Sequence, residues 1–301
     1  MFRCLIILIS VWFTAFSVLA QSDHVLITTL NCNAFFGGNE TKMQLGQPRT
    51  SADYWRKAEN LVGLWPTNAP LFVGLEEIGG AREAIYLSQI AAAKYKHAFA
   101  PISTETKDTY TEEAVGAILD LDQGWNFTGK PGRISDLDTN LSKHIVVQLT
   151  NSFLRTSLKL CVVHLRRGIG KYGLQEQRDQ DEALKNWAAK QLAKNPRENL
   201  IILGDFNESK KRGDPAQSLA VLLQPNLLRD PFESLPGKIR THANGKAYDR
   251  ILFSDAMASG AAGLKFENIS VREHPYGKGT NKYWFTDHFP VTATFVSVQR
   301  K

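Results

Sequence analysis

Polar side chains of the kinds that bind metal ions or transfer protons stand at the ends of several stretches that we expect to form buried strands. The clearest case is residues 199–207. Four consecutive apolar residues at 200–203 are typical of a strand buried on both faces, and Gly204 then ends the strand. Asp205 and Asn207 come next, two positions apart, so in extended chain both point to the same side. They could serve one shared ligand, although a strand ending in an Asx turn explains this segment alone equally well.

Other expected strands end in the same kinds of residue. The full set is Asn31, Glu77, His164, Asp205, Asn207, Asp249, Asp287 and His288. Each alone is weak evidence, because a polar residue at a strand end is usually just solvated. Together they indicate a site rich in carboxylate and amide oxygens, which suits a hard cation such as Mg²⁺, with Mn²⁺ or Ca²⁺ as alternatives. The chain has no HExxH, Walker, GxSxG or CxxC motif, which excludes the commonest zinc-protease, NTPase, serine-esterase and thiol-redox functions.

The elements that must position these residues follow from the spacing of apolar residues. Amphipathic helices are expected at 51–64, 81–93 and 174–194, with a shorter one at 216–223 and with Ser51 as the N-cap of the first. Strands are expected at 24–30, 71–75, 97–100, 114–121, 144–149, 157–165, 200–203, 248–253, 264–271 and 290–298, the fifth and sixth forming a hairpin. Strands outnumber helices about two to one, which favours two packed sheets with helices outside. No linker divides the chain, so we expect one domain over 21–301.

Residues 1–20 have the pattern of a secretory signal peptide. Arg3 precedes an apolar run, and Val18 and Ala20 occupy the small-residue positions before the expected cleavage. A membrane anchor is the alternative, but the run is short and no later stretch is long and apolar enough to span a bilayer. We therefore expect a secreted or periplasmic protein, exported by a bacterial route, without stable membrane insertion. Beyond residue 20, Cys32 and Cys161 could form a disulfide or remain buried thiols.

Six short motifs over residues 27 to 292 carry a more specific signal. In chain order they are LNCNAFF, VGLEEIG, VVHL, ILGDFN, YDRIL and TDHFPV. They closely resemble the endonuclease/exonuclease/phosphatase superfamily of deoxyribonuclease-I-like, metal-dependent phosphodiesterases, and GDFN and TDH are the most specific of them. The resemblance covers nearly all of the chain after residue 20. It implies an α/β fold, a four-layer sandwich of two mixed β-sheets packed face to face with helices on the outside, and one site at the top of the sheets.

The resemblance implies a metal site made by Asn31 and Glu77, with Asp287 helping. Glu77 rather than Glu76 matches the pattern, because the family has Leu-Gln-Glu where this chain has Leu75-Glu76-Glu77. A divalent cation held there would offset the negative charge that makes a phosphodiester resist attack.

The resemblance also implies catalytic roles for His164, Asp205, Asn207, Asp249 and His288. Asp205 is similar to the residue that positions and deprotonates the attacking water, and Asn207 to one that holds a phosphate oxygen. Asp249 would fix one tautomer of His288 and favour its cationic form, which places a donor against the phosphate. His164 stands where secreted deoxyribonuclease-like members carry a histidine. It is either a second phosphate contact or acid, or a structural histidine.

The formal net charge is +6, and basic residues follow several of the strand ends, namely Arg166, Arg167, Lys210 and Lys282. Such a cationic rim favours an extended polyanion, so we expect a monomeric nuclease, an endonuclease acting on DNA or RNA. The loop aromatics Tyr283, Trp284 and Phe285 could stack bases or pack against the core. The alternatives are a sphingomyelinase- or phospholipase C-like enzyme, a phosphatase of small phosphoesters, and a non-catalytic binding protein on the same fold.

Overall fold

The computed structural model describes residues 24–36, 47–48, 50–103, 111–135, 143–168, 170–208, 219–276 and 281–298. The expected signal peptide at 1–20 and the expected substrate contact Lys210 lie outside these residues. Within them, no helix is both long and apolar enough to cross a membrane.

Two six-stranded sheets form the centre of the molecule. The first has the order β11 (Leu264–Val271), β12 (Val291–Ser297), β1 (His24–Phe35), β2 (Phe72–Ile78), β4 (Ala114–Asp120), β3 (Phe99–Ser103). The second has the order β5 (Asn126–Phe127), β6 (Lys143–Asn151), β7 (Thr156–His164), β8 (Leu200–Asp205), β10 (Asp249–Ser254), β9 (Leu228–Arg229). Each sheet is mixed, because β1–β2 and β7–β8 are parallel pairs and the other pairs are antiparallel.

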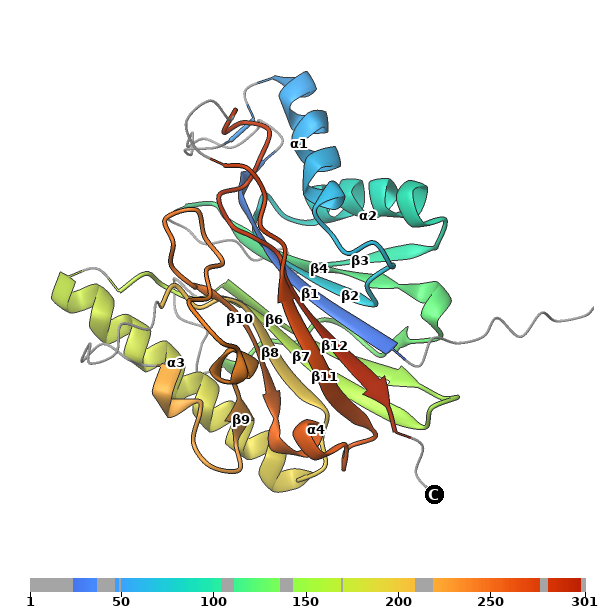
Figure 1. The fold of residues 1–301 in the computed structure, drawn as a ribbon, viewed down its shortest axis with the longest axis vertical. Coiled ribbons are helices and arrows are strands. Elements are labelled where there is room, and N and C mark those ends of the chain that lie inside the picture. The colour runs from blue at the N-terminus through green and yellow to red at the C-terminus, as the bar shows by residue number, and fades with distance from the viewer. Residues whose placement is uncertain are drawn as a thin grey trace, which may run out of the picture.

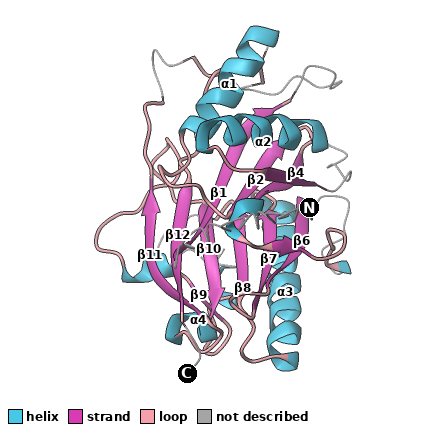
Figure 2. Cartoon of the chain, turned by 90° about the vertical axis from the view of Figure 1, so that its right-hand side faces the viewer, coloured by secondary structure: helices cyan, strands magenta, loops and turns pink. Residues whose placement is uncertain are grey.

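The long helices lie on the outer faces of the two sheets. Helices α1 (Ser51–Gly63) and α2 (Ala81–Tyr95) cover the first sheet, and α3 (Gly170–Lys194) covers the second (Figures 1 and 2). The short elements are α4 (Asp255–Ser259) and the 3₁₀ helices η1 (Leu121–Gln123), η3 (Leu219–Val221) and η4 (Pro231–Ser234). The expected four-layer α/β sandwich is confirmed.

The main core lies between the sheets, and residues of both inner faces contribute to it. Gly74 of β2 marks a close approach of the two sheets, since a Cβ atom there would meet the side chains of Leu203 and Val162 at 3.2 Å. Two smaller apolar clusters fill the spaces under α1 and α2 and under α3. The strands that carry the polar strand ends are therefore fixed by packing on both faces.

Most expected elements are present, with shifts at their ends. The hairpin is confirmed by the antiparallel pairing of β6 with β7. The expected N-cap Ser51 is wrong, because the Thr50 hydroxyl accepts the hydrogen bond from the Asp53 amide at 3.1 Å. Only residues 219–223 of the expected helix at 216–223 are described, and within them the helical part is the 3₁₀ turn η3. Cys32 and Cys161 are both buried free thiols, so they do not form the disulfide that the sequence left open.

Candidate active site

The carboxyl ends of β1, β2, β7 and β8 meet the start of β10 and the segment before β12 around one cavity of about 660 Å³. The expected site residues that line it are Glu77, His164, Arg166, Arg167, Asp205, Asn207, Asp287 and His288. Asn31 and Asp249 lie behind its wall, and each is hydrogen-bonded to a lining residue. The expected substrate contact Lys282 is among the described residues, but it does not line the cavity. Side chains more than two hundred positions apart in sequence thus share one hollow.

Strand register explains how three of these residues come together. His164 at the end of β7 is paired with Asp205 at the end of β8, and Asp205 is paired with Asp249 at the start of β10. Directly paired residues of neighbouring strands project to the same side of a sheet. The three side chains therefore stand in a row at one edge of the second sheet.

The backbone around the cavity adopts uncommon conformations. Gly204 has φ +135°, and a Cβ atom there would lie 1.9 Å from the Val163 carbonyl oxygen, so only glycine fits before Asp205. Glu77 and Asn207 both have φ 53°, in the left-handed region that non-glycine residues rarely adopt. Such strain is held in place by the surrounding structure and is commonly found at functional sites.

Asn31 connects the two sheets at the floor of the site. Its Nδ2 donates to Glu77 Oε1 at 2.9 Å and to Asp205 Oδ2 at 3.0 Å, while its Oδ1 accepts from the Asn33 amide at 2.9 Å. The second oxygen of Glu77 accepts from the Ala34 amide at 3.1 Å. Two carboxylates of different sheets are thus held by the NH₂ group of one side-chain amide.

Asp205 is almost completely buried, and its carboxylate accepts hydrogen bonds from Asn31 and from the Asn207 amide at 2.7 Å. Burial is the largest cause that raises the pKa of Asp205 to about 6; the charge of His288 opposes this rise and the charge of Asp249 adds to it. A carboxylate with a pKa in this range can take a proton from water near neutral pH.

Asp249 and His288 form a buried pair. His288 Nδ1 lies 2.9 Å and 3.1 Å from the two oxygens of Asp249, and the Thr241 hydroxyl donates to the same carboxylate at 2.6 Å. Burial opposes the charged imidazole, but the charge and hydrogen bond of Asp249, together with the charge of Asp205, raise the pKa of His288 well above its usual value. The cationic ring turns Nε2 toward Asp205 Oδ2, 3.8 Å away.

His164 is in the opposite charge state. Burial, followed by the charges of Lys143 and His288, holds the pKa of His164 well below its usual value. Its Nε2 lies 3.7 Å from Glu77 Oε1 and 3.8 Å from Asp205 Oδ2, beyond hydrogen-bond distance. A neutral ring at this position can accept or share a ligand's hydrogen bond without adding charge.

The lining residues that the sequence reasoning missed include the ionisable groups Glu113, Lys143 and His242. Glu113 accepts a hydrogen bond from Lys143 in a buried ion pair, and burial, then the charge of Glu77, raise the pKa of Glu113 to about 7. Glu113 directly precedes β4 and Lys143 begins β6, so the strand-end rule that found the other residues could have found these two. Nothing in the sequence around His242 identifies it.

His242 is paired with Asp287 at the edge of the cavity. Its Nδ1 accepts from the Asn244 amide at 2.9 Å, which places the ring proton on Nε2, 3.3 Å from Asp287 Oδ2. Burial acts to raise the pKa of Asp287, but the hydrogen bond from His242 and the charge of His288 outweigh it and lower this pKa. The rings of His242 and His288 meet edge to face at 4.5 Å. Metal binding through Nε2 would require the other tautomer and would leave the Asn244 amide without its acceptor.

The remaining donor set suits a hard divalent cation. Glu77, Glu113 and His164 offer ligand atoms within 4.8 Å of one another, and the carboxylates Asp205 and Asp287 face the same cavity. Closely spaced carboxylates in a buried site repel one another: after burial, the charge of Glu77 is the next cause that raises the pKa of Glu113. A cation bound between them would relieve that repulsion. Among the expected metal residues, Asn31 does not line the cavity and Asp287 is paired with His242, whereas Glu77 lines the cavity and belongs to this cluster, so Glu77 is the best placed to bind a cation. These three assignments stay predictions.

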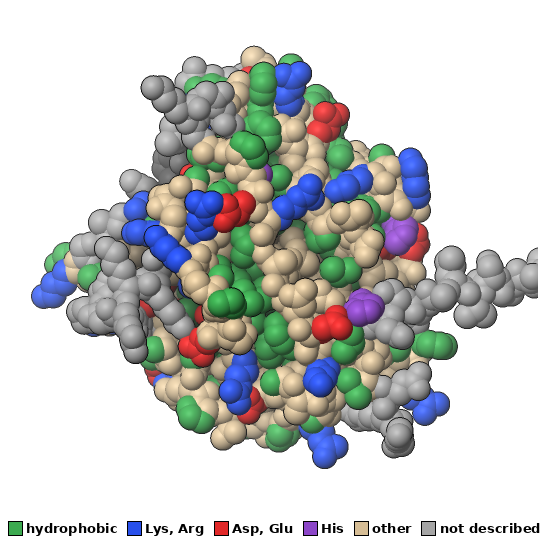
Figure 3. All heavy atoms as spheres, viewed as in Figure 1, with side chains coloured by type: hydrophobic (Ala, Val, Ile, Leu, Met, Phe, Trp, Pro, Cys, Tyr) green, Lys and Arg blue, Asp and Glu red, His purple; other side chains and the backbone are tan. Residues whose placement is uncertain are grey.

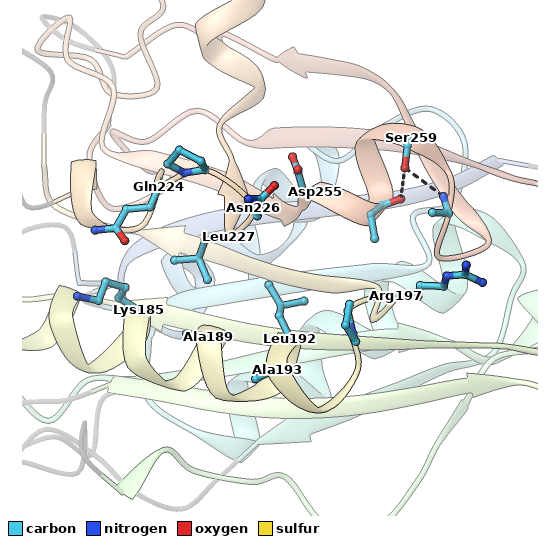
Figure 4. Close-up of a pocket in the computed structure, with 14 residues that line it drawn as sticks. Lys185, Ala189, Leu192, Ala193, Arg197, Gln224, Asn226, Leu227, Asp255 and Ser259 are labelled. Carbon is cyan, nitrogen blue, oxygen red and sulfur yellow. Dashed lines mark hydrogen bonds between the residues drawn. The ribbon is translucent and has the colours of Figure 1, made fainter.

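A second hollow of about 630 Å³ lies away from this chemistry (Figure 4). It lies between the end of α3, the segment before β9, and α4. Figure 4 shows Ala189, Leu192 and Ala193 of α3 opposite Leu227. The described lining of this second hollow includes charged groups such as Lys185, but it has no cluster of titratable side chains like that of the first cavity. The first cavity is therefore the candidate active site.

Known structures share this fold. No family model matches the sequence, and no curated protein matches it either. TDP2 of D. rerio, complexed with a single-strand DNA product, is similar over 91% of this chain and 99% of its own at 18% identity and TM-score 0.61. A mannosyl-6-phosphatase of Bacteroides thetaiotaomicron VPI-5482 is similar over 90% and 99% at 12% identity and TM-score 0.60. An endonuclease/exonuclease/phosphatase of Beutenbergia cavernae DSM 12333 is similar over 91% and 72% at 13% identity and TM-score 0.61.

These likenesses establish the architecture. The chain has the endonuclease/exonuclease/phosphatase fold, as the six motifs implied, and the candidate site lies where those motifs meet. Identities this low show the fold alone, so the activity has to be argued from the site.

Proposed function

We propose that this protein is a metal-dependent phosphodiesterase whose substrate is nucleic acid. The observation that carries the proposal is the pairing of Asp205 with His288 across one cavity. A buried carboxyl with a pKa of about 6 lies 3.8 Å from a histidine whose pKa is raised well above its usual value. These are the properties of a base for water and of a cationic donor for a phosphate oxygen.

Each residue has a defined part in such a reaction. Asp205 accepts the proton of the attacking water, and its position is fixed by the Asn31 and Asn207 amides. His288 donates from Nε2 to a phosphate oxygen, while Asp249 holds Nδ1 and stabilises the cation. A divalent cation bound at Glu77 would supply further positive charge, which would offset the negative charge of the phosphate.

The support for nucleic acid comes from the rim and from the fold. Arg167 is exposed and lines the cavity, and within the described residues it has no ion-pair partner. TDP2 of D. rerio, a structure of the same fold, holds a single-strand DNA product. Elsewhere the basic side chains do not gather into one field on the face shown in Figure 3. The exposed Arg167 at the cavity is therefore the feature that favours a polyanion.

A phosphatase of small phosphoesters is the second candidate. Arg166 is bound to Glu176 at 2.5 Å, and Lys282 lies over the Tyr283 ring outside the cavity. The cationic rim is consequently smaller than the sequence suggested, which a small substrate tolerates better than a long polyanion does. The mannosyl-6-phosphatase of the same fold is consistent with this alternative.

We further propose, from the sequence of residues 1–20, that the protein is exported and acts outside the cytoplasm. We also propose, from the sequence alone, that the protein is a monomer.

The purified protein should be incubated with plasmid DNA, RNA, sphingomyelin, inositol phosphates and mannose 6-phosphate, with Mg²⁺ and separately with EDTA. Cleavage of DNA or RNA that EDTA stops, and that Asp205→Ala abolishes, supports the nuclease proposal. Asp255→Ala on α4 is the matched control, because Asp255 pairs with Arg229 away from the cavity. Cleavage of lipid or sugar phosphate alone would overturn the nuclease in favour of the alternatives, and no cleavage of any substrate would favour a binding protein.

A further inference from the structure

Helix α1 carries a stripe of polar residues that faces the loop leading to β12 and the end of β1. Asp53, Lys57 and Asn60 are spaced four and three residues apart, so they lie on one side of the helix, with Arg56 beside them. The apolar residues Tyr54, Ala58, Leu61 and Val62 pack the neighbouring face against the first sheet. The polar stripe is therefore held in a fixed orientation by the core.

Three residues of this stripe bind Trp284, in the loop that leads to β12. The indole Nε1 donates to Asp53 Oδ1 at 2.6 Å, and Asn60 Nδ2 donates to the Trp284 carbonyl at 2.9 Å. The Arg56 guanidinium lies 4.2 Å from the centre of the ring. The other Asp53 oxygen accepts from the Thr50 hydroxyl at 3.0 Å, so the carboxylate is anchored at the start of the helix. Figure 1 shows α1 beside this loop.

The bound loop continues directly into the site. Two residues after Trp284, the Thr286 hydroxyl donates to the Asn31 carbonyl at 2.7 Å and accepts from the His288 amide at 3.0 Å. The Asp287 carbonyl accepts from the Ala243 amide at 2.8 Å. The backbone that carries Asp287 and His288 is thus fixed on one side by the sheet and the 241–243 segment, and on the other by α1.

The same stripe also supports the end of β1. Lys57 is fully buried, and its Nζ donates to the Asn33 carbonyl. Asn33 and Ala34 have φ 50° and 57°, and this left-handed turn directs the Ala34 amide to Glu77. One helix therefore contacts both backbone segments that place Glu77 and His288 around the cavity.

From this geometry we propose that α1 is the positioning element of the active site and that Trp284 is its main positioning residue. The inference rests on the proposed phosphodiesterase function, because positioning is measured as an effect on turnover. Trp284 is not part of the described lining of the cavity. Its role is to set the place of Asp287 and His288, so its loss should reduce kcat and leave substrate binding unchanged. Its contacts with α1 support packing against the protein, which is one of the two roles that the sequence left open for the loop aromatics.

The test compares Trp284→Phe, Asp53→Ala and the double variant with the wild type, using bis(p-nitrophenyl) phosphate and Mg²⁺. Phenylalanine keeps an aromatic ring beside Arg56 and removes the N–H donor together with the five-membered ring that carries it. Small displacements of catalytic groups are costly, so each single variant should lose roughly ten-fold in kcat with KM changed less than about two-fold. The double variant should lose no more than the larger single loss, because both changes break the same hydrogen bond. Trp55→Phe on the same helix is the matched control, since Trp55 is exposed and packs on Tyr86 instead.

Hydrogen exchange of the metal-free protein gives a readout that does not depend on activity. Both single variants should exchange faster over residues 281–289, including the His288 amide, and the sheet strands should be unchanged. Unchanged exchange together with full kcat would overturn the proposal, as would a rise in KM at constant kcat. If the wild type hydrolyses nothing, the proposed function fails, while faster exchange over 281–289 still supports the positioning role and unchanged exchange still removes it.

Discussion

Replacing Asp205 by asparagine should stabilise the metal-free protein at alkaline pH and abolish its turnover. The Asp205 carboxyl has a pKa of 3.8 as an ordinary aspartate and about 6 in the folded protein. The folded state thus holds this proton more tightly than the unfolded chain does. The stability that results is fully present below pH 3.8 and is lost as the pH rises through about 6. A rise of about two in pKa corresponds to roughly 3 kcal/mol, of which about 2 kcal/mol is lost between about pH 4.5 and pH 8.

Asparagine cannot ionise, so Asp205→Asn escapes this loss. Its oxygen can still accept from the Asn207 amide, but the acceptor for Asn31 Nδ2 and the attraction to His288 disappear, at a cost of about 1–2 kcal/mol. The variant should therefore be no more stable than the wild type at about pH 4.5 and about 1 kcal/mol more stable at about pH 8.

The measurement is urea unfolding of both proteins in EDTA at the two pH values, followed by turnover assays with Mg²⁺. Asp255→Asn, in the exposed pair with Arg229, is the control and should show no comparable change with pH. An identical difference in unfolding free energy at both pH values would refute the claim that Asp205 is destabilised by burial. Turnover near that of the wild type would remove Asp205 from the reaction.

Further predictions concern the neighbouring groups. Asn207→Ala and His288→Ala should each reduce turnover by roughly a hundred-fold or more, checked by kcat on folded protein, because each removes a group that contacts the phosphate. Removing the divalent cation with EDTA should stop hydrolysis, and titrating Mg²⁺ into the metal-free protein should raise Tm, an increase that Glu77→Gln should diminish. Glu76→Gln should fold and keep turnover within about three-fold: Glu76 is fully buried, burial raises its pKa well above the usual value, and a neutral carboxyl resembles an amide. Steady-state kinetics and urea unfolding of that variant check the last point.

The sequence was a good guide wherever one strand end carries its own signal. The apolar run before Gly204 and the paired residues Asp205 and Asn207 predict both the strand and its polar end, and the structure has both. The choice of Glu77 over Glu76 depended on the resemblance to a family, and the structure gives it a physical reason. Glu76 is fully buried and accepts from the Thr29 hydroxyl at 2.6 Å, whereas Glu77 turns into the cavity.

What the sequence could not supply are contacts that arise only when the two sheets pack. Glu113 and Lys143 belong to different sheets, and their ion pair depends on the stacking of β4 over β6. The prediction of a strong cationic rim was too high for the same reason. Arg166 reads as free charge in sequence, yet the fold places Glu176 of α3 beside it. For Trp284 the sequence left base stacking and packing against the core both open, and the structure places α1 next to it.

The two histidines of the site show how packing assigns chemistry to residues of the same type. His288 has Asp249 on Nδ1 and Asp205 near Nε2, which raise its pKa against the effect of burial. For His164, burial and then the charge of Lys143 lower the pKa, and among the described residues its buried Nδ1 has no hydrogen-bond partner. Asp205 lies 3.8 Å from the Nε2 atoms of both rings. Groups whose environments push their pKa values apart can act as acid and base at one pH. In the proposed reaction, the neutral His164 therefore leaves Asp205 available as the base, and the cationic His288 is the group that donates to the phosphate.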